Sequence, residues 1–95
     1  MTETATAAGQ QCTVLYFAGA SSYAGRDSES FPAPVPLGQL LAAVEARHPG
    51  IRGAVLDACL VTVNLDYVDV PAAGDEGVLI QTADEVAIIP PVSSG

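Results

Sequence analysis

Side chains that could act as catalysts are few in this sequence. It contains one histidine, His48, and two separated cysteines, Cys12 and Cys59; it has no lysine, since its three basic residues are all arginine. Both cysteines lie in apolar runs, where a thiol usually behaves as a small buried hydrophobic group. His48 falls at a predicted helix end with no partner acid indicated nearby, so we expect a capping residue. Neither a metal-ligand spacing nor a nucleophile with its base is present in these residues.

The C-terminal segment is the stronger candidate for chemistry. After the last predicted strand the chain continues as Pro90, Pro91, Val92, Ser93, Ser94 and Gly95. The last four residues, fully extended, span about 13 Å, which is enough to enter a pocket of another protein. Glycine and serine keep such a segment slender, and the two prolines reduce the entropy lost when it is ordered. A ragged polar terminus explains the tail alone equally well.

Size and charge limit the class of protein. A chain of 95 residues forms one small domain. Eleven acidic residues against three arginines give a formal charge of −8, which argues against nucleic-acid or membrane partners and favours a basic protein partner. Surplus acid also simply keeps a domain soluble. Without a membrane-spanning apolar run or the pattern of a secretion signal, we expect a soluble, cytoplasmic protein.

The first third of the sequence predicts two strands. Residues 1–11 are small and polar and predict a disordered N-terminal extension. The apolar run at residues 12–18 predicts a central strand covered on both faces. A loop that can include one helical turn is expected at 19–27, followed by a second strand at 28–31.

One amphipathic helix is predicted over residues 36–48. Its apolar stripe recurs at i, i+3, i+4 and i+7, through Leu37, Leu40, Leu41 and Val44. The prolines at positions 32, 34 and 36 are expected to stop strand pairing before this helix. The stripe predicts that the helix covers the core.

The remaining sequence predicts a hairpin and a last strand. Residues 58–65 and 67–70 favour two antiparallel strands, 78–81 a short extended piece, and 86–89 the final strand. Two strands, one helix and further strands indicate an α+β domain, with one main helix packed across one face of a mixed sheet.

Four blocks of the sequence resemble a known family. They are VLYFA at 14–18, EARHPG at 45–50, the pairs VN at 63–64 and YV at 67–68, and DEVAIIPPV at 84–92. Together they resemble the small subunits of molybdopterin synthase over about residues 12–95. The last block is the most specific, because an acidic pair, an apolar strand, two prolines and a small-residue tail form a demanding combination.

The resemblance implies a ubiquitin-like β-grasp domain over residues 12–91 and a flexible tail at 92–95. It implies that an E1-like activating enzyme adenylates the Gly95 carboxylate with ATP, after which sulfur transfer produces a thiocarboxylate. The domain would bind the large, catalytic subunit, insert its tail there and donate sulfur to a cyclic pyranopterin precursor of the molybdenum cofactor. The chain would then be a non-catalytic sulfur donor that binds no cofactor or metal itself.

We predict that the partner contacts an apolar patch beside the tail. Its candidate residues are Phe17, Ile88, Pro90, Pro91 and Val92. Core packing must take some of them, because alternation prevents Ile88 and Ile89 from both facing the core. Asp84 and Glu85 are expected to meet a basic rim on the partner.

The tail departs from the family pattern at Ser94, where the family has the first of two terminal glycines. Three explanations are open: the added hydroxymethyl group clashes with the partner's channel, the natural chain continues by one residue, or the partner tolerates serine. Other functions also stay open, namely a carrier for thiamine thiazole synthesis, a ubiquitin-type protein tag, or an interaction module that is never acylated. An independent enzyme is the least compatible class.

Overall fold

Five strands form the main sheet of the computed structural model, which describes residues 10–72 and 74–90. In spatial order they are β2 (Ser28–Pro32), β1 (Gln11–Tyr16), β7 (Glu85–Ile89), β4 (Leu60–Val63) and β5 (Asp66–Val68). The β1–β7 pair is parallel and the other three pairs are antiparallel, so the sheet is mixed as predicted. The predicted N-terminal extension lies almost wholly outside the described residues.

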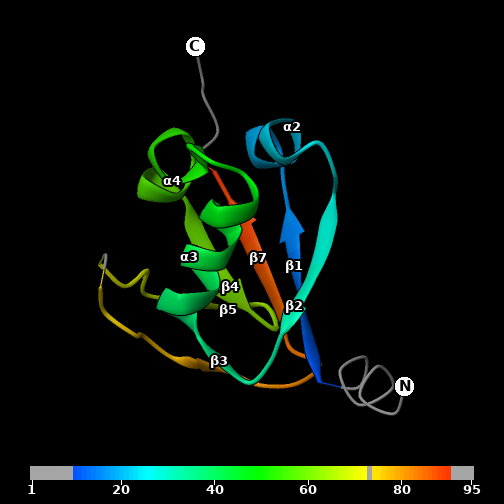
Figure 1. Cartoon of the computed structure of the whole chain (residues 1–95), viewed down its shortest axis with the longest axis vertical. Helices are drawn as coiled ribbons and strands as arrows, with labels where there is room; N and C mark the ends of the chain where they lie inside the picture. Colours follow the sequence, from blue (N-terminus) through cyan, green and yellow to red (C-terminus); the bar gives the residue numbers. More distant parts are fainter. Residues whose placement is uncertain (1–9, 73, 91–95) are drawn as a thin grey trace.

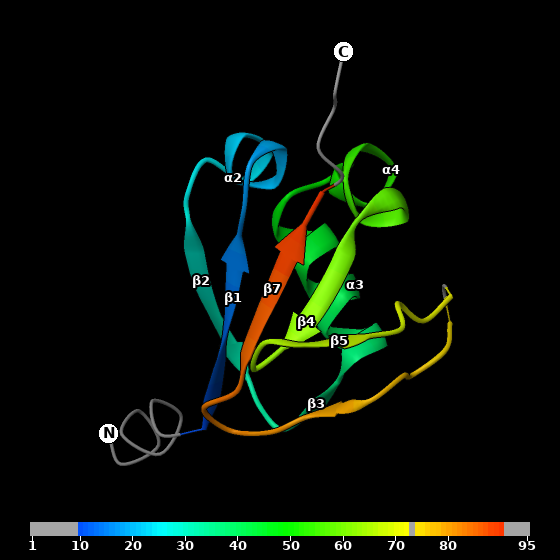
Figure 2. The same ribbon diagram turned by 180° about the vertical axis from the view of Figure 1, so that it is seen from behind.

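Helix α3 (Leu37–Arg47) packs across one face of this sheet (Figures 1 and 2). Its buried residues are the predicted stripe, Leu37, Leu40, Leu41 and Val44. The remaining elements are α2 (Gly19–Ala24), β3 (Val35–Pro36), α4 (Ile51–Ala54), the 3₁₀ turn η1 (Leu56–Ala58) and β6 (Leu79–Ile80). The predicted two-layer α+β architecture is therefore confirmed, and no helix in the described part of the chain is long and apolar enough to cross a bilayer.

Alternation along the strands divides the sheet into a core face and an open face. In β1 the side chains of Cys12, Val14 and Tyr16 are buried, while Thr13 and Leu15 are only half-buried. The prediction of a strand covered on both faces was therefore wrong for β1, because helices pack on one side only. Cys12 and Cys59 are both buried, as predicted.

Two local predictions were also wrong. Pro32 pairs with Gln11, and Val35–Pro36 pairs with β6, although prolines were expected to stop pairing. Proline lacks only the N–H donor and is tolerated on edge strands, and β2 is an edge strand. Helix α2 lies where a loop that can include one helical turn was predicted, and α4 was missed; six and four residues are too few to display an apolar period.

Glu29 of β2 links the sheet to the C-terminal end of α3. Its carboxylate accepts hydrogen bonds from the Tyr16 hydroxyl at 2.9 Å and from Arg47 at 3.1 Å, and its Oε1 lies 2.9 Å from His48 Nε2. Arg26 approaches the same carboxylate at 3.7 Å. His48 caps the helix through its backbone N–H as predicted, but it does have a partner acid. That partner is 19 positions away in the sequence, so only the tertiary fold brings them together.

The pKa of Glu29 depends on this cluster. Burial acts to raise the pKa of the carboxyl group, but hydrogen bonds from His48, Tyr16 and Arg47 outweigh it and hold the pKa below its usual range. The folded protein thus stabilises the ionised form. Burial, followed by the hydrogen bond to Glu29, raises the pKa of Tyr16, so the phenol stays a donor.

We predict an acid-sensitive contribution to stability from Glu29. Because its pKa is lower in the folded state, the contribution is present above its ordinary value of 4.5 and is lost as pH falls through the folded pKa. Glu29→Gln should lower the free energy of unfolding at neutral pH by about 1–3 kcal/mol. The free energy of unfolding of this variant should also change less with pH below about pH 5 than that of the parent chain.

Urea unfolding measured across the acidic range tests this prediction. The exposed Glu76→Gln variant removes one carboxylate elsewhere and should follow the parent curve. If the free energy of unfolding changed with pH in the same way for the parent chain and for Glu29→Gln, the role given to Glu29 would be contradicted.

Candidate functional site

The C-terminal end of β7 is held in the middle of the sheet. This strand pairs with β1 on one edge and with β4 on the other. The last bond on the β1 side runs from the Phe17 N–H to the Ile88 carbonyl at 3.2 Å. Pro90 is half-buried and has no N–H to continue the ladder. The chain therefore leaves the sheet at Pro90, near the α2 and α4 helices (Figure 1).

The predicted tail lies beyond this exit. Pro91, Val92, Ser93, Ser94 and Gly95 are outside the described residues. The partner contact of Pro91, the threading of Val92, Ser93 and Ser94, and the acyl-carrying role of Gly95 stay predictions. What the structure describes is the support from which this segment begins.

Three apolar side chains form a row on the open face beside the exit, and we call Phe17, Leu60 and Ile89 the exit row. The register pairs Leu60 with Ile89. It also pairs Tyr16 with Ile88, which puts Phe17 next to Ile89. Phe17 is 47% exposed and Leu60 is 54% exposed. Figure 2 shows this face of β1, β7 and β4, which α3 leaves uncovered.

Ala18 turns the chain sharply after Phe17. Its backbone has φ 51° and ψ −125°, a region that favours glycine. The turn leads directly into α2 and leaves a hollow of about 540 Å³ beside Phe17, whose lining includes Leu15, Ser21 and Asp27. Ser21 donates a hydrogen bond to Asp27 at 2.8 Å. The hollow and the exit row together make an uneven, largely apolar surface.

The assignment of Ile88 to the partner-binding patch was wrong. Ile88 is fully buried on the α3 side of β7, and Ile89 faces the open side. Alternation predicted that only one of them faces the core, but the sequence did not decide which one. Leu60 was missed for the same reason, although its apolar type within a strand pattern was visible. Phe17 and Pro90 do lie where the patch was predicted.

Asp84 and Glu85 lie at the other end of β7, about 17–20 Å from the exit at Pro90 at the usual rise per residue. Asp84 accepts hydrogen bonds from the Asn64 side chain at 2.9 Å and from the Gln81 N–H at 2.8 Å. The Glu85 N–H donates to Asn64 Oδ1 at 2.9 Å. These bonds tie the β4–β5 turn to the start of β7, so Asp84 has a structural role. Contact of this pair with a basic rim stays a prediction.

Cys12 does not offer an alternative reactive group. Burial raises the pKa of its thiol, which keeps it protonated at neutral pH. Its side chain is only 1% exposed. Among the described residues, the arrangement favours presentation of the chain end over side-chain catalysis.

The sheet order and the crossing helix define the class of this protein as a ubiquitin-like β-grasp domain. A putative molybdopterin converting factor subunit 1 from Pyrococcus furiosus has the same fold, with a TM-score of 0.68, 26% identity, and coverage of 87% of this chain and 99% of that one. The chain belongs to the ThiS family, whose model matches residues 14–95.

Relatives with curated names are similar over most of their length. The molybdopterin synthase sulfur carrier subunit of Emericella nidulans is 54% identical over 86% of this chain and 94% of that protein. The human protein of the same name is 38% identical over 90% of this chain and 94% of that protein. A complex of subunits 1 and 2 of molybdopterin-converting factor from Helicobacter pylori contains a chain with a TM-score of 0.61. That chain is 19% identical and matches 90% of this chain and 99% of its own length, which establishes similarity of fold.

Alanine substitutions at Ile88 of β7 and at Leu60 of β4 should have different effects on the free energy of unfolding. Ile88→Ala creates a cavity in the core and should lower the free energy of unfolding by about 2–5 kcal/mol. Leu60→Ala removes an exposed side chain and should change it by less than about 1 kcal/mol. Equal losses in urea unfolding would contradict the division into a core face and an exit row.

Proposed function

We propose that this chain is the sulfur carrier subunit of a molybdopterin synthase, with the Gly95 carboxylate as the sulfur-bearing group. The observation that carries the proposal is the central placement of β7, which ends beside the exit row and brings the chain out of the sheet at Pro90. The named relatives and the ThiS family match support the same function.

The chemistry takes place on the chain end and needs two enzymes. A carboxylate is a poor acyl donor, so a carboxylate oxygen first attacks the α-phosphate of ATP and pyrophosphate leaves. Hydrosulfide then attacks the carbonyl carbon of the acyl adenylate, AMP leaves, and a thiocarboxylate remains at Gly95. Transfer of that sulfur to a cyclic pyranopterin precursor, with oxygen from water replacing it, restores the carboxylate.

The described residues serve this chemistry as a rigid support. The partners are an E1-like adenylating and sulfurtransferase enzyme and the large subunit of the synthase, and each must take the tail into its own pocket. The exit row supplies an apolar contact next to the tail, which suits an interface core. The charge of −8 favours basic partner surfaces. The Helicobacter complex of two subunits supports the large subunit as a partner.

The exit row is expected to determine partner affinity. Phe17→Ser and Leu60→Ser should each weaken binding to the large subunit about tenfold or more, because exposed apolar anchors dominate such interfaces. Leu79→Ser is a matched control, since Leu79 is 53% exposed against 54% for Leu60 and lies on β6. Calorimetric titration measures the affinity. An equal loss with Leu79→Ser, or no loss with the other two, would reject the exit row as the contact.

Removal of Gly95 separates a carrier from an interaction module. The shortened chain should bind the large subunit within about threefold of the parent, because one glycine contributes little contact area. Sulfur transfer in the reconstituted synthase should be lost, because the terminal carboxylate is displaced by one residue.

Ser94→Gly is the matched control for that deletion. It changes the neighbouring position but keeps the terminal carboxylate in register, so sulfur transfer should persist, and a faster rate would indicate that the partner's channel is tight around Ser94. Full sulfur transfer by the chain without Gly95 would contradict the carrier function.

A further inference from the structure

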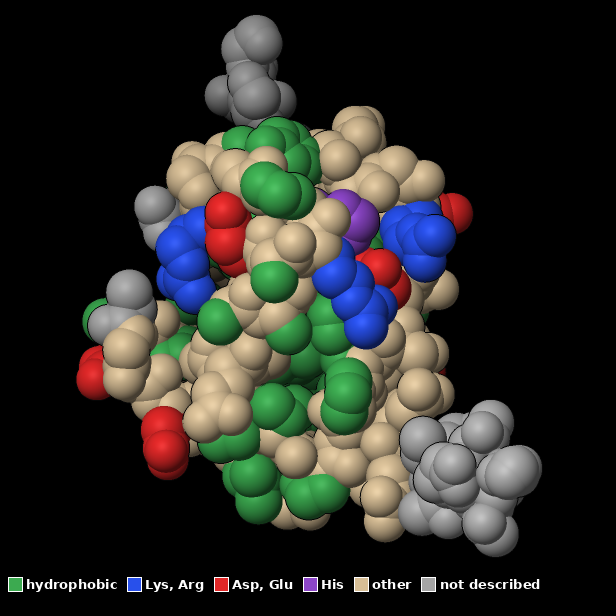
Figure 3. Space-filling view, in the orientation of Figure 1, with side chains coloured by type: hydrophobic (Ala, Val, Ile, Leu, Met, Phe, Trp, Pro, Cys, Tyr) green, Lys and Arg blue, Asp and Glu red, His purple; other side chains and the backbone are tan. Residues whose placement is uncertain are grey.

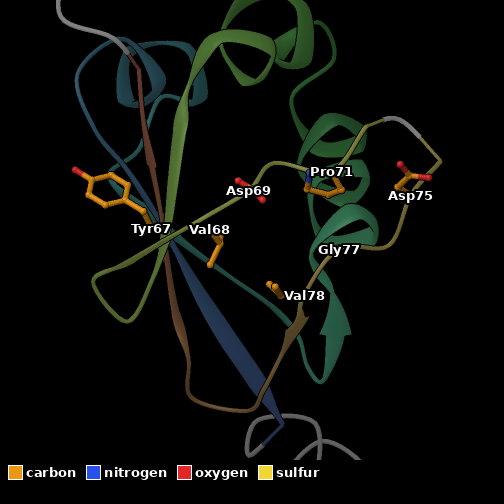
Figure 4. Close-up of a pocket in the computed structure, with 7 residues that line it drawn as sticks. All are labelled: Tyr67, Val68, Asp69, Pro71, Asp75, Gly77 and Val78. Carbon is orange, nitrogen blue, oxygen red and sulfur yellow. The ribbon is translucent and has the colours of Figure 1, made fainter.

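A second surface lies at the opposite edge of the sheet from β2. Strand β5 pairs only with β4 among the described residues. Beside it is a groove of about 530 Å³, lined by Tyr67, Val68, Asp69, Pro71, Asp75, Gly77 and Val78. Figure 4 shows Val68 and Asp69 on one side of this groove and Gly77 and Val78 on the other. We call it the β5 groove.

The far wall of the β5 groove is fixed to the start of α3. The first N–H groups of a helix lack partners within the helix, and here those of Leu37 and Gly38 donate to the carbonyls of Val78 at 2.7 Å and Glu76 at 2.6 Å. The approach is close, because a Cβ at position 38 would collide with the Asp75 carbonyl. The wall is therefore held in place before any ligand binds.

The near wall offers an apolar surface and a strand edge. Val68 points toward Val78 across the groove, and Val78 is 43% exposed. Pro71 packs against Gly77, where an added Cβ would lie 2.9 Å from the proline ring. An edge strand with an adjoining apolar groove is suited to an added extended segment.

Charge indicates which kind of segment fits. Asp69 and Asp75 line the groove, and no lysine or arginine does. No salt bridge to either carboxylate occurs within residues 10–72 and 74–90. The sequence has no basic residue after Arg52. In Figure 3 the arginines are spread across the middle of the view with acidic side chains beside them, whereas the acidic side chains at the lower left edge, on the side where Figure 1 places β5 and β6, have no arginine next to them.

We propose that the β5 groove binds an extended, basic segment of a partner protein. The segment lies along β5 with arginine or lysine side chains toward Asp69 and Asp75 and with alternate apolar residues toward Val68 and Val78. The groove is at the β5 edge, separate from the chain exit, so the segment binds whether or not the tail is inserted elsewhere.

Nuclear magnetic resonance titration of the full-length chain tests this binding directly. The probe is a capped peptide of alternating valine and arginine, five residues long, and the matched control peptide carries glutamate in place of arginine. The arginine peptide should shift amide signals within residues 66–78, with an affinity that falls as salt is added. The glutamate peptide should leave them unchanged. This experiment needs neither partner enzyme, so its result is independent of the proposed sulfur-carrier function.

Single charge variants complete the test. Asp69→Asn and Asp75→Asn should each weaken binding of the arginine peptide about two- to fivefold, the usual range for exposed ion pairs. Asp27→Asn removes the same charge beside α2 and should have no effect. The proposal is overturned by equal shifts with both peptides, by shifts confined to the exit row, or by groove variants that behave like Asp27→Asn.

Discussion

Strand β7 is the last strand of the chain, yet it occupies the middle of the sheet. Its ladders to β1 and β4 hold together two halves, β2–β1 and β4–β5, which share no strand pair of their own in the described part of the chain. The parallel ladder to β1 requires the intervening chain to cross over, which is why α3 lies across one face. In the proposed function, a partner that binds the chain end would act on a strand that is paired on both edges.

Because side chains alternate along β7, one residue packs in the core and the next lies on the open face. Ile88 points toward α3 and joins the core, and Ile89 points to the open face beside Phe17 and Leu60. The Glu29 cluster connects β2 to the end of α3. The packing of α3 on the sheet is therefore stabilised at the edge strand as well as at the centre. A rigid support of this kind lowers the ordering cost of binding.

The sequence predicted those elements whose apolar residues repeat at a regular spacing. It did not predict contacts between residues that only the tertiary fold brings together. The stripe from Leu37 to Val44 located α3 to within one residue at each end, because a helix must repeat its apolar face. A short run of apolar residues such as 86–89 does not reveal which side chain faces the core, so Ile88 was assigned to the wrong face. The pairing of His48 with Glu29 depends on how β2 packs against α3, and no local spacing encodes it.

The central claim is that sulfur is carried on the terminal carboxylate and not on a side chain. Intact mass spectrometry of the full-length chain, after incubation with an activating enzyme, ATP and a sulfur donor, measures this most directly. The account predicts a gain of about 16 Da, the exchange of one oxygen for sulfur in an activated carboxyl group, located by fragmentation at Gly95. A sulfur adduct located on Cys12 or Cys59, or no gain with an activating enzyme that converts the relatives, would contradict it.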